Sequence, residues 1–495
     1  MEIKVRKEDW KTFDGDAVVF FTFEAQTEEL PQEVYEQVKP FMVDVDFKGK
    51  KGEILKVPVQ GFPFKRVYIV GLGKKDKVNR DIAREVSAKT AQRLEKDKNR
   101  KVLINVKKEV CSQACTEGLV LGTYKFDKYK SKKEDGDYKG LETVEMANAD
   151  EQKVKIGQIL AQAQNFARDL VNTPPNEINP ETFAQIAQDL AKEYDFEIEV
   201  KDPQWVEKEM PGLWAVGKGS STKPRFIHIK YKPQGEAKKK LAFVGKGLTF
   251  DSGGLNIKPE QFMRTMKMDK SGACAVLGIF KALGELKKAG LAPKNVEIHG
   301  FVGAAENMPD GNSYRPDDII RMRNGKTVEV GNTDAEGRIT LGDVLTYASE
   351  QQPDKIVDMA TLTGACVVAL GEYTAGIFGN NQEFIDQYLK HSKETGERMW
   401  QLPMDDELLR EHIKSPVADI SNIGSTRYGG AITAAMFLEE FIGEKDGKKI
   451  PWVHIDIAGP AWANKPYKWN PQKGGTGFGV RTALSFIFEE DQNKE

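Results

Sequence analysis

Two segments of this 495-residue chain place acidic and basic residues among glycines: residues 246–269 and the heptapeptide NTDAEGR at 332–338. Carboxylates that lie close together repel one another, and a divalent cation between them relieves the repulsion. Four carboxylates can bind two metal ions about 3.5–4 Å apart, which activate a water molecule and polarise the scissile bond. The segments therefore predict a two-metal hydrolase centre without histidine ligands, formed by Asp251, Asp269, Asp334 and Glu336 with Lys246, Lys258 and Arg338.

The heptapeptide has a predicted conformation of its own. In an extended backbone, residues two apart point to the same side, so Asp334, Glu336 and Arg338 would share one side. Gly331 and Gly337 disfavour a helix here. We therefore expect an extended segment that presents two acids together. A purely structural interpretation stays open, in which Arg338 pairs with one of the acids.

The basic residues need separate roles beside two cations. Lys246 can act as a neutral nitrogen ligand, because a metal ion inverts the usual pKa preference of a lysine. Lys258 can stay charged and stabilise the oxyanion of a tetrahedral intermediate. Arg338 can bind a small anion that takes the proton of the attacking water. The chain has five histidines and no HExxH motif, so the base must come from the metal centre or from a bound anion.

Composition limits the function classes. Hydrophobic residues make up 39% and charged residues 30% of the chain, which is typical of a globular protein with a large core. The net charge of −2 gives no overall field that would attract nucleic acid or an anionic membrane. The N-terminus lacks the apolar core of a signal peptide, and no apolar run is long enough to span a bilayer. We expect a cytoplasmic protein without a disulfide framework, since only four cysteines occur.

The first third of the chain alternates strand and helix patterns. A long amphipathic helix follows and stops before Pro174-Pro175, where proline prevents continuation. We predict an N-terminal α/β domain over 1–148 with an assembly or regulatory role, a connecting helix over 149–173 and a catalytic domain over 174–495. The expected strands are 18–23, 66–70 and 101–106, the expected helices are 81–94 and 113–124, and 125–139 is expected to be a loop or hairpin.

The remainder of the chain also alternates strands with helices, which predicts an α/β fold with a mostly parallel sheet flanked by helices. Ligands of such sheets bind beyond the carboxyl ends of the strands, where the glycine-rich segments of this chain are expected to follow. His228 falls within a strand, and we expect it to be packed rather than a ligand. The expected strands are 196–200, 225–231, 239–244, 296–302, 355–359 and 452–457, and the expected helices are 179–194, 271–288, 341–351 and 431–441.

Five segments, GKGLTFDSGGLNIKP, MKMDKSGA, ENMP, NTDAEGR and ATLTGA, are similar to those of the leucyl aminopeptidase (cytosol aminopeptidase) family. The resemblance covers the chain after about residue 170, and the first third resembles the family only in layout. It implies a dinuclear metallo-exopeptidase, a hydrolase that removes N-terminal residues, often leucine, from peptides. It also implies a homohexamer, a dimer of trimers with active sites facing an interior cavity.

The resemblance assigns roles by motif position. Lys258 matches the residue that stabilises the tetrahedral intermediate, and Arg338 matches the residue that binds bicarbonate, which acts as the base. Two divalent ions, Zn²⁺ or Mn²⁺, are implied. The tighter metal site matches Lys246, Asp251, Asp269 and Glu336, and the more exchangeable site matches Asp251, Asp334 and Glu336. The pocket for the N-terminal side chain matches Met266, Thr361, Gly364, Ala458 and Ala461, a mostly apolar set consistent with leucine or methionine.

Two other functions remain as alternatives. A two-metal hydrolase could act on another bond, such as a phosphoester, although phosphate chemistry calls for more basic groups than this cluster offers. A second, DNA-binding role is known for some members of the family. The near-neutral net charge does not support nucleic-acid binding, and no membrane partner is expected.

Overall fold

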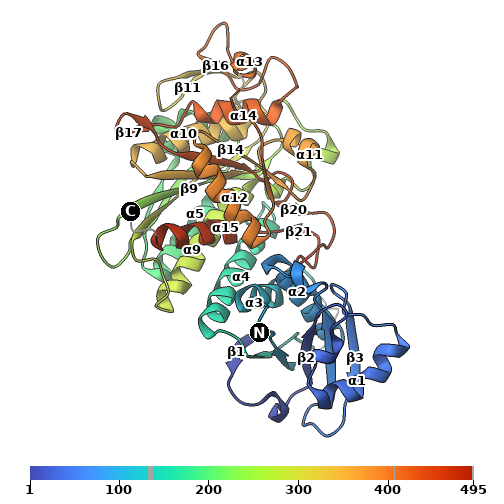
Figure 1. Ribbon diagram of the computed structural model, residues 1–495. Helices are drawn as coiled ribbons and strands as arrows, with labels where there is room; N and C mark the ends of the chain where they lie inside the picture. The colour runs from blue at the N-terminus through green and yellow to red at the C-terminus, as the bar shows by residue number, and fades with distance from the viewer. Residues whose placement is uncertain (132–137, 406, 493–495) are drawn as a thin grey trace. The chain divides into compact units, whose positions relative to one another are not determined.

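The computed structural model describes residues 1–131, 138–405 and 407–492, which form two compact units (Figure 1). The first unit comprises Met1–Asn165 with Lys465–Lys473, and the second comprises Phe166–Asn464 with Gly474–Glu495. The predicted long helix is α4 (Glu151–Asn172), and it contributes residues to both units. Residues 465–473, which fall within the catalytic domain predicted from the sequence, cluster with the first unit.

The first unit contains a six-stranded sheet in the order β1-β6-β5-β2-β4-β3. Every neighbouring pair is parallel except β3 and β4. The three predicted strands and two predicted helices are confirmed, whereas β1, β3, β6 and α1 were not predicted. Part of the predicted loop or hairpin, residues 132–137, lies outside the described residues. The strands are β1 (Glu2–Arg6), β2 (Ala17–Thr22), β3 (Ile54–Pro58), β4 (Arg66–Gly71), β5 (Lys101–Asn105) and β6 (Thr143–Ala147), and the helices are α1 (Gln32–Asp44), α2 (Arg80–Lys96) and α3 (Ser112–Gly122).

The second unit contains an eight-stranded sheet in the order β15-β14-β19-β13-β9-β10-β8-β7. The four central strands β19, β13, β9 and β10 are parallel, so the predicted mostly parallel sheet is confirmed. His228 lies in β8, is fully buried and packs against Phe301, as expected of a core histidine. The strands are β7 (Glu197–Lys201), β8 (Arg225–Tyr231), β9 (Lys239–Asp251), β10 (Val296–Asn307), β13 (Lys355–Ala360), β14 (Ala375–Gly379), β15 (Met399–Gln401) and β19 (Trp452–Asp456).

Helices cover both faces of this sheet. Helices α5, α9 and α15 lie on one face, and α10 and α14 lie on the other (Figure 1). Asn179 and Thr182 form the capping box that begins α5, with Pro180 at the first helical position as predicted. Helix α12, with 14 residues, is a further long helix, and the remaining elements are short helices and small two- and three-stranded pieces. The helices are α5 (Pro180–Tyr194), α6 (Pro203–Glu209), α7 (Pro211–Gly217), α8 (Glu260–Met263), α9 (Ser271–Lys288), α10 (Glu336–Glu350), α11 (Gly364–Leu370), α12 (Gln382–Thr395), α13 (Glu407–Glu411), α14 (Gly430–Glu439) and α15 (Val480–Gln492).

Two central strands are longer than predicted. Strand β9 continues to Asp251, and β10 continues to Asn307, because the two pair in parallel over their whole length. The first parts of the glycine-rich segments 245–254 and 303–312, which were expected to follow these strands, therefore belong to them, and only residues 252–254 and 308–312 follow. No described helix is long and apolar enough to cross a membrane.

Helix α9 packs unusually close to the sheet. A Cβ atom at Gly272 would lie 2.0 Å from the carbonyl oxygen of Met359 in β13 and 2.9 Å from the backbone nitrogen of Lys246 in β9. Only a residue without a side chain allows this approach. The contact places the start of α9, and the Asp269 that precedes it, directly against the middle of β9.

We predict that Gly272→Ala lowers the stability of the second unit by about 1–3 kcal/mol, because the added methyl group meets backbone atoms that cannot rotate away. Activity should also fall, since the displaced helix carries Asp269 with it. Thermal unfolding and peptide-hydrolysis assays measure the two effects. Gly311→Ala is the matched control, because a Cβ atom there meets nothing within 4 Å. An unchanged melting temperature for Gly272→Ala would contradict the close contact.

Candidate active site

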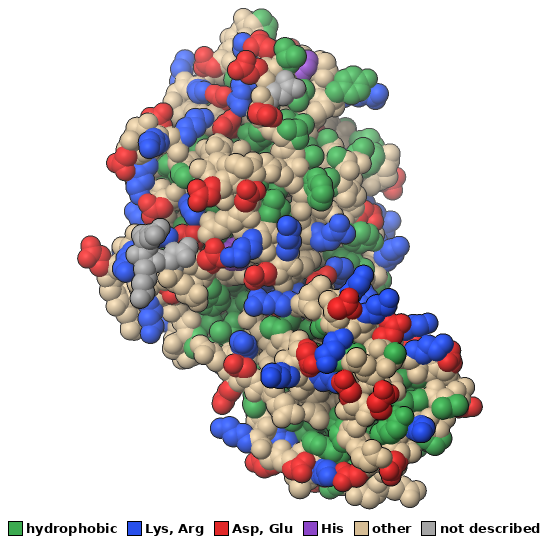
Figure 2. All heavy atoms as spheres, in the orientation of Figure 1, with side chains coloured by type: hydrophobic (Ala, Val, Ile, Leu, Met, Phe, Trp, Pro, Cys, Tyr) green, Lys and Arg blue, Asp and Glu red, His purple; other side chains and the backbone are tan. Residues whose placement is uncertain are grey.

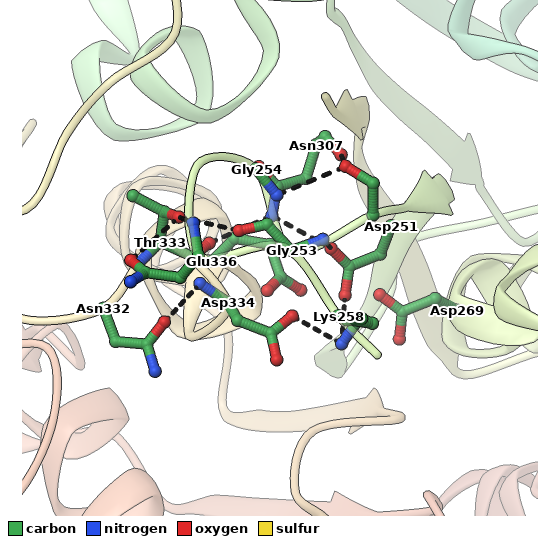
Figure 3. A network of polar contacts seen from close by, with 12 residues as sticks. Asp251, Gly253, Gly254, Lys258, Asp269, Asn307, Asn332, Thr333, Asp334 and Glu336 are labelled. Atoms are coloured by element: carbon green, nitrogen blue, oxygen red, sulfur yellow. Dashed lines mark hydrogen bonds and ion pairs between the residues drawn. The ribbon is translucent and has the colours of Figure 1, made fainter. Parts of the chain in front are cut away.

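Four segments of the second unit bring the predicted acids together (Figure 3). Strand β9 carries Lys246 and Asp251, and the short helix η4 (Met266–Lys270) carries Asp269. Asp334 lies just before α10, and Glu336 is the first residue of that helix. Lys258 reaches the cluster from the loop after β9.

A β-bulge makes Lys246 and Asp251 face the same way. These residues are five apart, and in a regular strand an odd separation places side chains on opposite faces. The pairing of β9 with β10 skips Thr249, so β9 carries one residue more than its partner at this point. An extra residue of this kind shifts the alternation by one position. The bulge therefore allows one strand to supply both residues to one site.

Lys246 is buried and bridges two acids. Its Nζ lies 2.7 Å from Oδ2 of Asp269 and 2.9 Å from Oε1 of Glu336. It also donates a hydrogen bond of 2.9 Å to the carbonyl oxygen of Thr361. Burial by itself lowers the pKa of Lys246, but the carboxylates of Asp269 and Glu336 outweigh burial and raise the pKa. Lys246 is therefore protonated while these acids are its neighbours.

Lys258 bridges the other pair of acids. Its Nζ lies 2.9 Å from Oδ2 of Asp251 and 2.5 Å from Oδ1 of Asp334. Burial opposes the charge of Lys258, but the nearby carboxylates, Asp251 first, raise its pKa above the ordinary value. The side chain is 14% exposed, so this cation lies at the edge of the cluster rather than beneath it.

The four carboxylates are crowded, and all but the half-buried Asp334 are buried. One oxygen from each of Asp251, Asp334 and Glu336 lies within 4.8 Å of the others. Burial raises the pKa of all four acids of the cluster, and repulsion from a neighbouring carboxylate raises each further: Glu336 acts on Asp251, Asp251 on Asp269 and Asp334, and Asp269 on Glu336. Four acids thus face two lysines, and more positive charge would stabilise them.

The cluster fits divalent metal ions. Its donor set consists of carboxylate oxygens with one lysine nitrogen, which suits hard and borderline cations. The raised pKa values show that the acids resist sharing this volume as anions, and bound cations would reverse that effect. Two hydrogen bonds also fix the orientation of the Asp251 carboxylate. Its Oδ1 accepts them from the backbone nitrogen of Gly253 at 2.8 Å and from Nδ2 of Asn307 at 2.9 Å.

The predicted extended conformation of NTDAEGR is wrong. Helix α10 begins at Glu336, so Glu336 and Arg338 lie in its first turn. The low helix propensity of Gly337 disfavours a helix, but the absence of a side chain at this position lets α10 approach Lys246 closely. A Cβ atom there would lie 2.5 Å from Cε of Lys246. Asp334 and Glu336 still converge, because Asp334 belongs to the turn before the helix.

Arg338 does not pair closely with the acids of its own segment. Its Nη1 donates a hydrogen bond of 2.9 Å to the carbonyl oxygen of Asn422, and among the described residues its buried Nε has no hydrogen-bond partner. Burial lowers the pKa of Arg338 to about 10, so it remains charged at neutral pH. A buried guanidinium with an unused N–H group can bind a small anion.

The residues expected to line the side-chain pocket differ in exposure. Thr361 is buried, and its Oγ1 donates a hydrogen bond of 2.6 Å to Oδ1 of Asp269. Met266 and Ala458 are half-buried, Gly364 is exposed at the start of α11, and Ala461 is almost fully buried. Thr361 is thus the only one of the five with a described side-chain hydrogen bond to the acidic cluster.

Sequence reasoning missed the residues that support the cluster. The buried Asp456 accepts hydrogen bonds from the backbone nitrogens of Leu362, Thr363 and Ala458, so one carboxylate joins the two loops that carry Thr361 and Ala458. Asn307 and Asn422 both fix the NTDAEGR segment by hydrogen bonds to its backbone. Asn307 falls in the quoted ENMP segment, but its residue type gave no signal of this role.

Comparison with known proteins identifies the family. The catalytic-domain model of the cytosol aminopeptidase family matches residues 165–484, and its N-terminal-domain model matches residues 19–133. The chain belongs to the cytosol aminopeptidase family. The N-terminal match extends beyond the resemblance in layout that the first third offered. The chain is accordingly a hydrolase, a metal-dependent aminopeptidase that acts on peptides.

Individual relatives agree with this assignment. A probable cytosol aminopeptidase of Aquifex aeolicus is 55% identical over 503 residues, which cover 100% of this chain and 99% of the relative. One of Persephonella marina is 52% identical, covering 99% and 100%. The structure of a mutant of tomato leucine aminopeptidase is similar with a TM-score of 0.87 at 32% identity, covering 99% of this chain and 96% of that one. The bottromycin maturation enzyme BotP, in complex with Mn, is similar with a TM-score of 0.85 at 33% identity, covering 96% and 100%.

We predict that Asn307→Ala weakens metal binding about 10- to 100-fold, because residues that orient a metal ligand typically contribute that much. Asp251 would keep its charge but lose one of its two orienting hydrogen bonds. Titration of the metal-free protein with Mn²⁺, followed by calorimetry, measures the change. Asn312→Ala, on an exposed loop, is the control. Wild-type affinity in Asn307→Ala would contradict the supporting role.

Proposed function

We propose that the chain releases N-terminal residues, leucine and other apolar residues among them, from peptides by a two-metal, activated-water mechanism. The observation that carries this proposal is the convergence of four carboxylates with Lys246 beneath them and Lys258 at their edge. Such a set combines ligands for two cations with a separate cation for the substrate. The family assignment supports the choice of an N-terminal peptide bond over other bonds.

The metal ligands in this proposal are Lys246, Asp251, Asp269, Asp334 and Glu336. Two bound divalent cations, Zn²⁺ or Mn²⁺, would lower the pKa of a water between them and polarise the scissile carbonyl. The similarity to BotP, whose structure is a complex with Mn, supports a divalent metal. Lys246 must lose its proton to become a ligand. Bound cations would favour this loss, because they would neutralise the carboxylates that raise the pKa of Lys246.

Lys258 is the proposed catalytic cation. Its neighbours raise its pKa, so its ammonium group stays protonated at neutral pH and offers three N–H donors. Lying at the edge of the cluster, it can direct a donor to the carbonyl oxygen of a peptide as negative charge develops there. The side chain is therefore suited to stabilising a tetrahedral intermediate rather than to binding metal.

Arg338 is the proposed site of the base. Its buried Nε–H, which has no hydrogen-bond partner among the described residues, and its charge suit bicarbonate, which would accept the proton of the attacking water. The N-terminal side chain of the substrate is proposed to contact the pocket of Met266, Thr361, Gly364, Ala458 and Ala461. A homohexamer in the cytoplasm completes the proposal, on the strength of the family assignment. The domain limits 148 and 174 remain those proposed from the sequence.

The direct test compares substrates with and without metal. We expect hydrolysis of leucine p-nitroanilide in the presence of Mn²⁺, no hydrolysis of its N-acetylated form, and loss of activity with a chelator. p-Nitrophenyl phosphate tests the phosphoester alternative in the same assay. Hydrolysis of only the phosphate ester, or equal cleavage of the acetylated substrate, would overturn the proposal.

We predict that Lys258→Ala lowers kcat about 10²- to 10³-fold, the usual loss when one oxyanion donor is removed. Metal content should stay at the wild-type level, because the substitution removes no ligand. Steady-state kinetics and elemental analysis separate the two effects. Asp251→Ala is the contrasting variant and should lose metal together with activity. A near-normal kcat in Lys258→Ala would refute its role.

The acids also predict how metal binding depends on pH. In the metal-free protein their pKa values are raised, so their contribution to stability is greatest below the ordinary carboxyl pKa of about 4 and is lost as pH rises through the raised values. The ligands must be deprotonated to bind metal. We therefore expect the increase in melting temperature on adding Mn²⁺ to be larger at about pH 8 than at about pH 5.5. An increase that does not change with pH would contradict this prediction.

A further inference from the structure

The first unit has a topological switch point that the proposed function does not use. Strands β2 and β5 are parallel neighbours in its sheet. After β2 the chain forms α1 and continues toward β3 and β4, whereas after β5 it forms α3 and continues to β6 on the other side. Val38 of α1 packs with Phe20 in one core cluster, and Leu119 of α3 packs with Phe21 in the other, so the two helices cover opposite faces.

Adjacent parallel strands whose connections leave in opposite directions open a crevice at their carboxyl ends, and such crevices bind ligands in open α/β sheets. A cavity of about 970 Å³ lies at this place in the first unit. Its floor includes Phe21 at the end of β2 and Asn105 and Val106 at the end of β5. Its volume is at the upper end of the range of about 300–1,000 Å³ for sites that bind small molecules and cofactors.

The charges around this cavity favour an anion. Two of the acids that line the cavity, Glu29 and Glu109, each form an ion pair with a lysine. Glu29 lies 2.7 Å from Nζ of Lys107, and Glu109 lies 3.1 Å from Nζ of Lys75. The third lining acid, Asp150, keeps its charge and accepts a hydrogen bond of 2.9 Å from the backbone N–H of Lys153. The lining nevertheless has more basic than acidic residues, since Arg80, Lys107, Lys108 and Lys153 face these three acids.

Two basic residues that line the cavity have no ion-pair partner among the described residues. Within the described part of the chain, the ammonium groups of Lys108 and Lys153 make neither ion pairs nor hydrogen bonds, and both side chains are exposed. Helix α3 begins beside them at Ser112, and the side chain of the preceding N-cap residue, Cys111, does not cap the helix. The uncommitted positive charge of the cavity therefore gathers between the loop after β5 and the start of α4.

The cavity also has an apolar portion. Leu30 and Val106 are buried residues of its wall, and Pro31 adjoins them. Asn105 and Asn148 provide amide groups, which are joined by a hydrogen bond of 2.7 Å from Nδ2 of Asn148 to Oδ1 of Asn105. Apolar surface, amides and free cations in one crevice are the groups that contact the sugar, base and phosphate of a nucleotide.

We propose that this cavity binds a nucleoside phosphate, with its phosphate group near Lys108 and Lys153 and its base against Leu30 and Val106. A small ligand is favoured over nucleic acid because the site is a crevice of limited volume rather than an extended basic surface. Over the face seen in Figure 2, Lys and Arg side chains are interspersed with Asp and Glu side chains. This site is separate from the peptidase cluster and does not depend on the metal.

The test measures binding of the four ribonucleoside monophosphates to the full-length protein by calorimetry, with inorganic phosphate, the free nucleosides and a short DNA duplex as comparisons. We expect at least one monophosphate to bind more tightly than phosphate or its nucleoside alone. Hydrogen–deuterium exchange should show protection in residues 105–112 and 148–153. Absence of monophosphate binding, equal binding of inorganic phosphate, or binding of the duplex alone would each overturn the proposal.

A charge-reversal variant tests whether the phosphate group binds near Lys108 and Lys153. The double variant Lys108→Glu, Lys153→Glu should weaken monophosphate binding about tenfold or more, since each substitution removes a charged donor. Both side chains are exposed and unpaired, so folding should be preserved, and circular dichroism checks this. Lys65→Glu is the matched control, because Lys65 is also exposed and precedes the amino end of β4, whereas the cavity lies at the carboxyl ends of the strands. Equal affinity in the double variant and the control would overturn the site.

Discussion

Mutual repulsion among four crowded carboxylates, three of them buried, is the constraint that shapes the catalytic unit. Asp251, Asp269 and Glu336 are each at most 3% exposed, and no arrangement of the fold can keep them charged without nearby cations. Two lysines provide part of that charge. A polypeptide gains nothing in stability from such a cluster by itself, so the cluster is understandable as a device for binding metal.

Close packing of two helices against β9 holds the repelling carboxylates in place. Gly272 lets α9 approach β9, and Gly337 lets α10 approach the side chain of Lys246. Close packing of this kind leaves Lys246 and the acids of the cluster few alternative positions. Hydrogen bonds from Thr361 and Asn307 then fix the orientation of individual carboxylates. Rigid support of this kind is what a site needs if its groups are to act on a substrate without rearranging.

Much of this arrangement could be predicted from the sequence. The order of strands and helices, the start of α5 and the limits of α9 follow from local patterns of apolar residues, prolines and caps. The acids and lysines of the cluster were identified because their types and spacing are unusual. Local patterns did not reveal the length of β9, since the pairing with β10 that extends it is a long-range interaction.

The wrong conformation predicted for NTDAEGR and the missed supporting residues also have their origin in long-range contacts. Gly337 has a low helix propensity, yet it lies in α10, where the side chain of Lys246 leaves no room for a Cβ atom. Asn307 and Asp456 act through hydrogen bonds to partners far away in the chain, and neither residue type is distinctive on its own. Supporting residues are therefore harder to predict than the acids and lysines of the cluster.

The bulge at Thr249 has a consequence for how the chain can change over time. The side chains of residues 246 and 251 share a face only because of the number of residues between them. Substitutions within this stretch leave the number unchanged, whereas the gain or loss of a single residue would turn one of the two side chains away. Insertions and deletions here are thus excluded more strictly than changes of residue type, and transplanting these motifs onto an ideal, unbulged parallel sheet would separate the lysine from the aspartate.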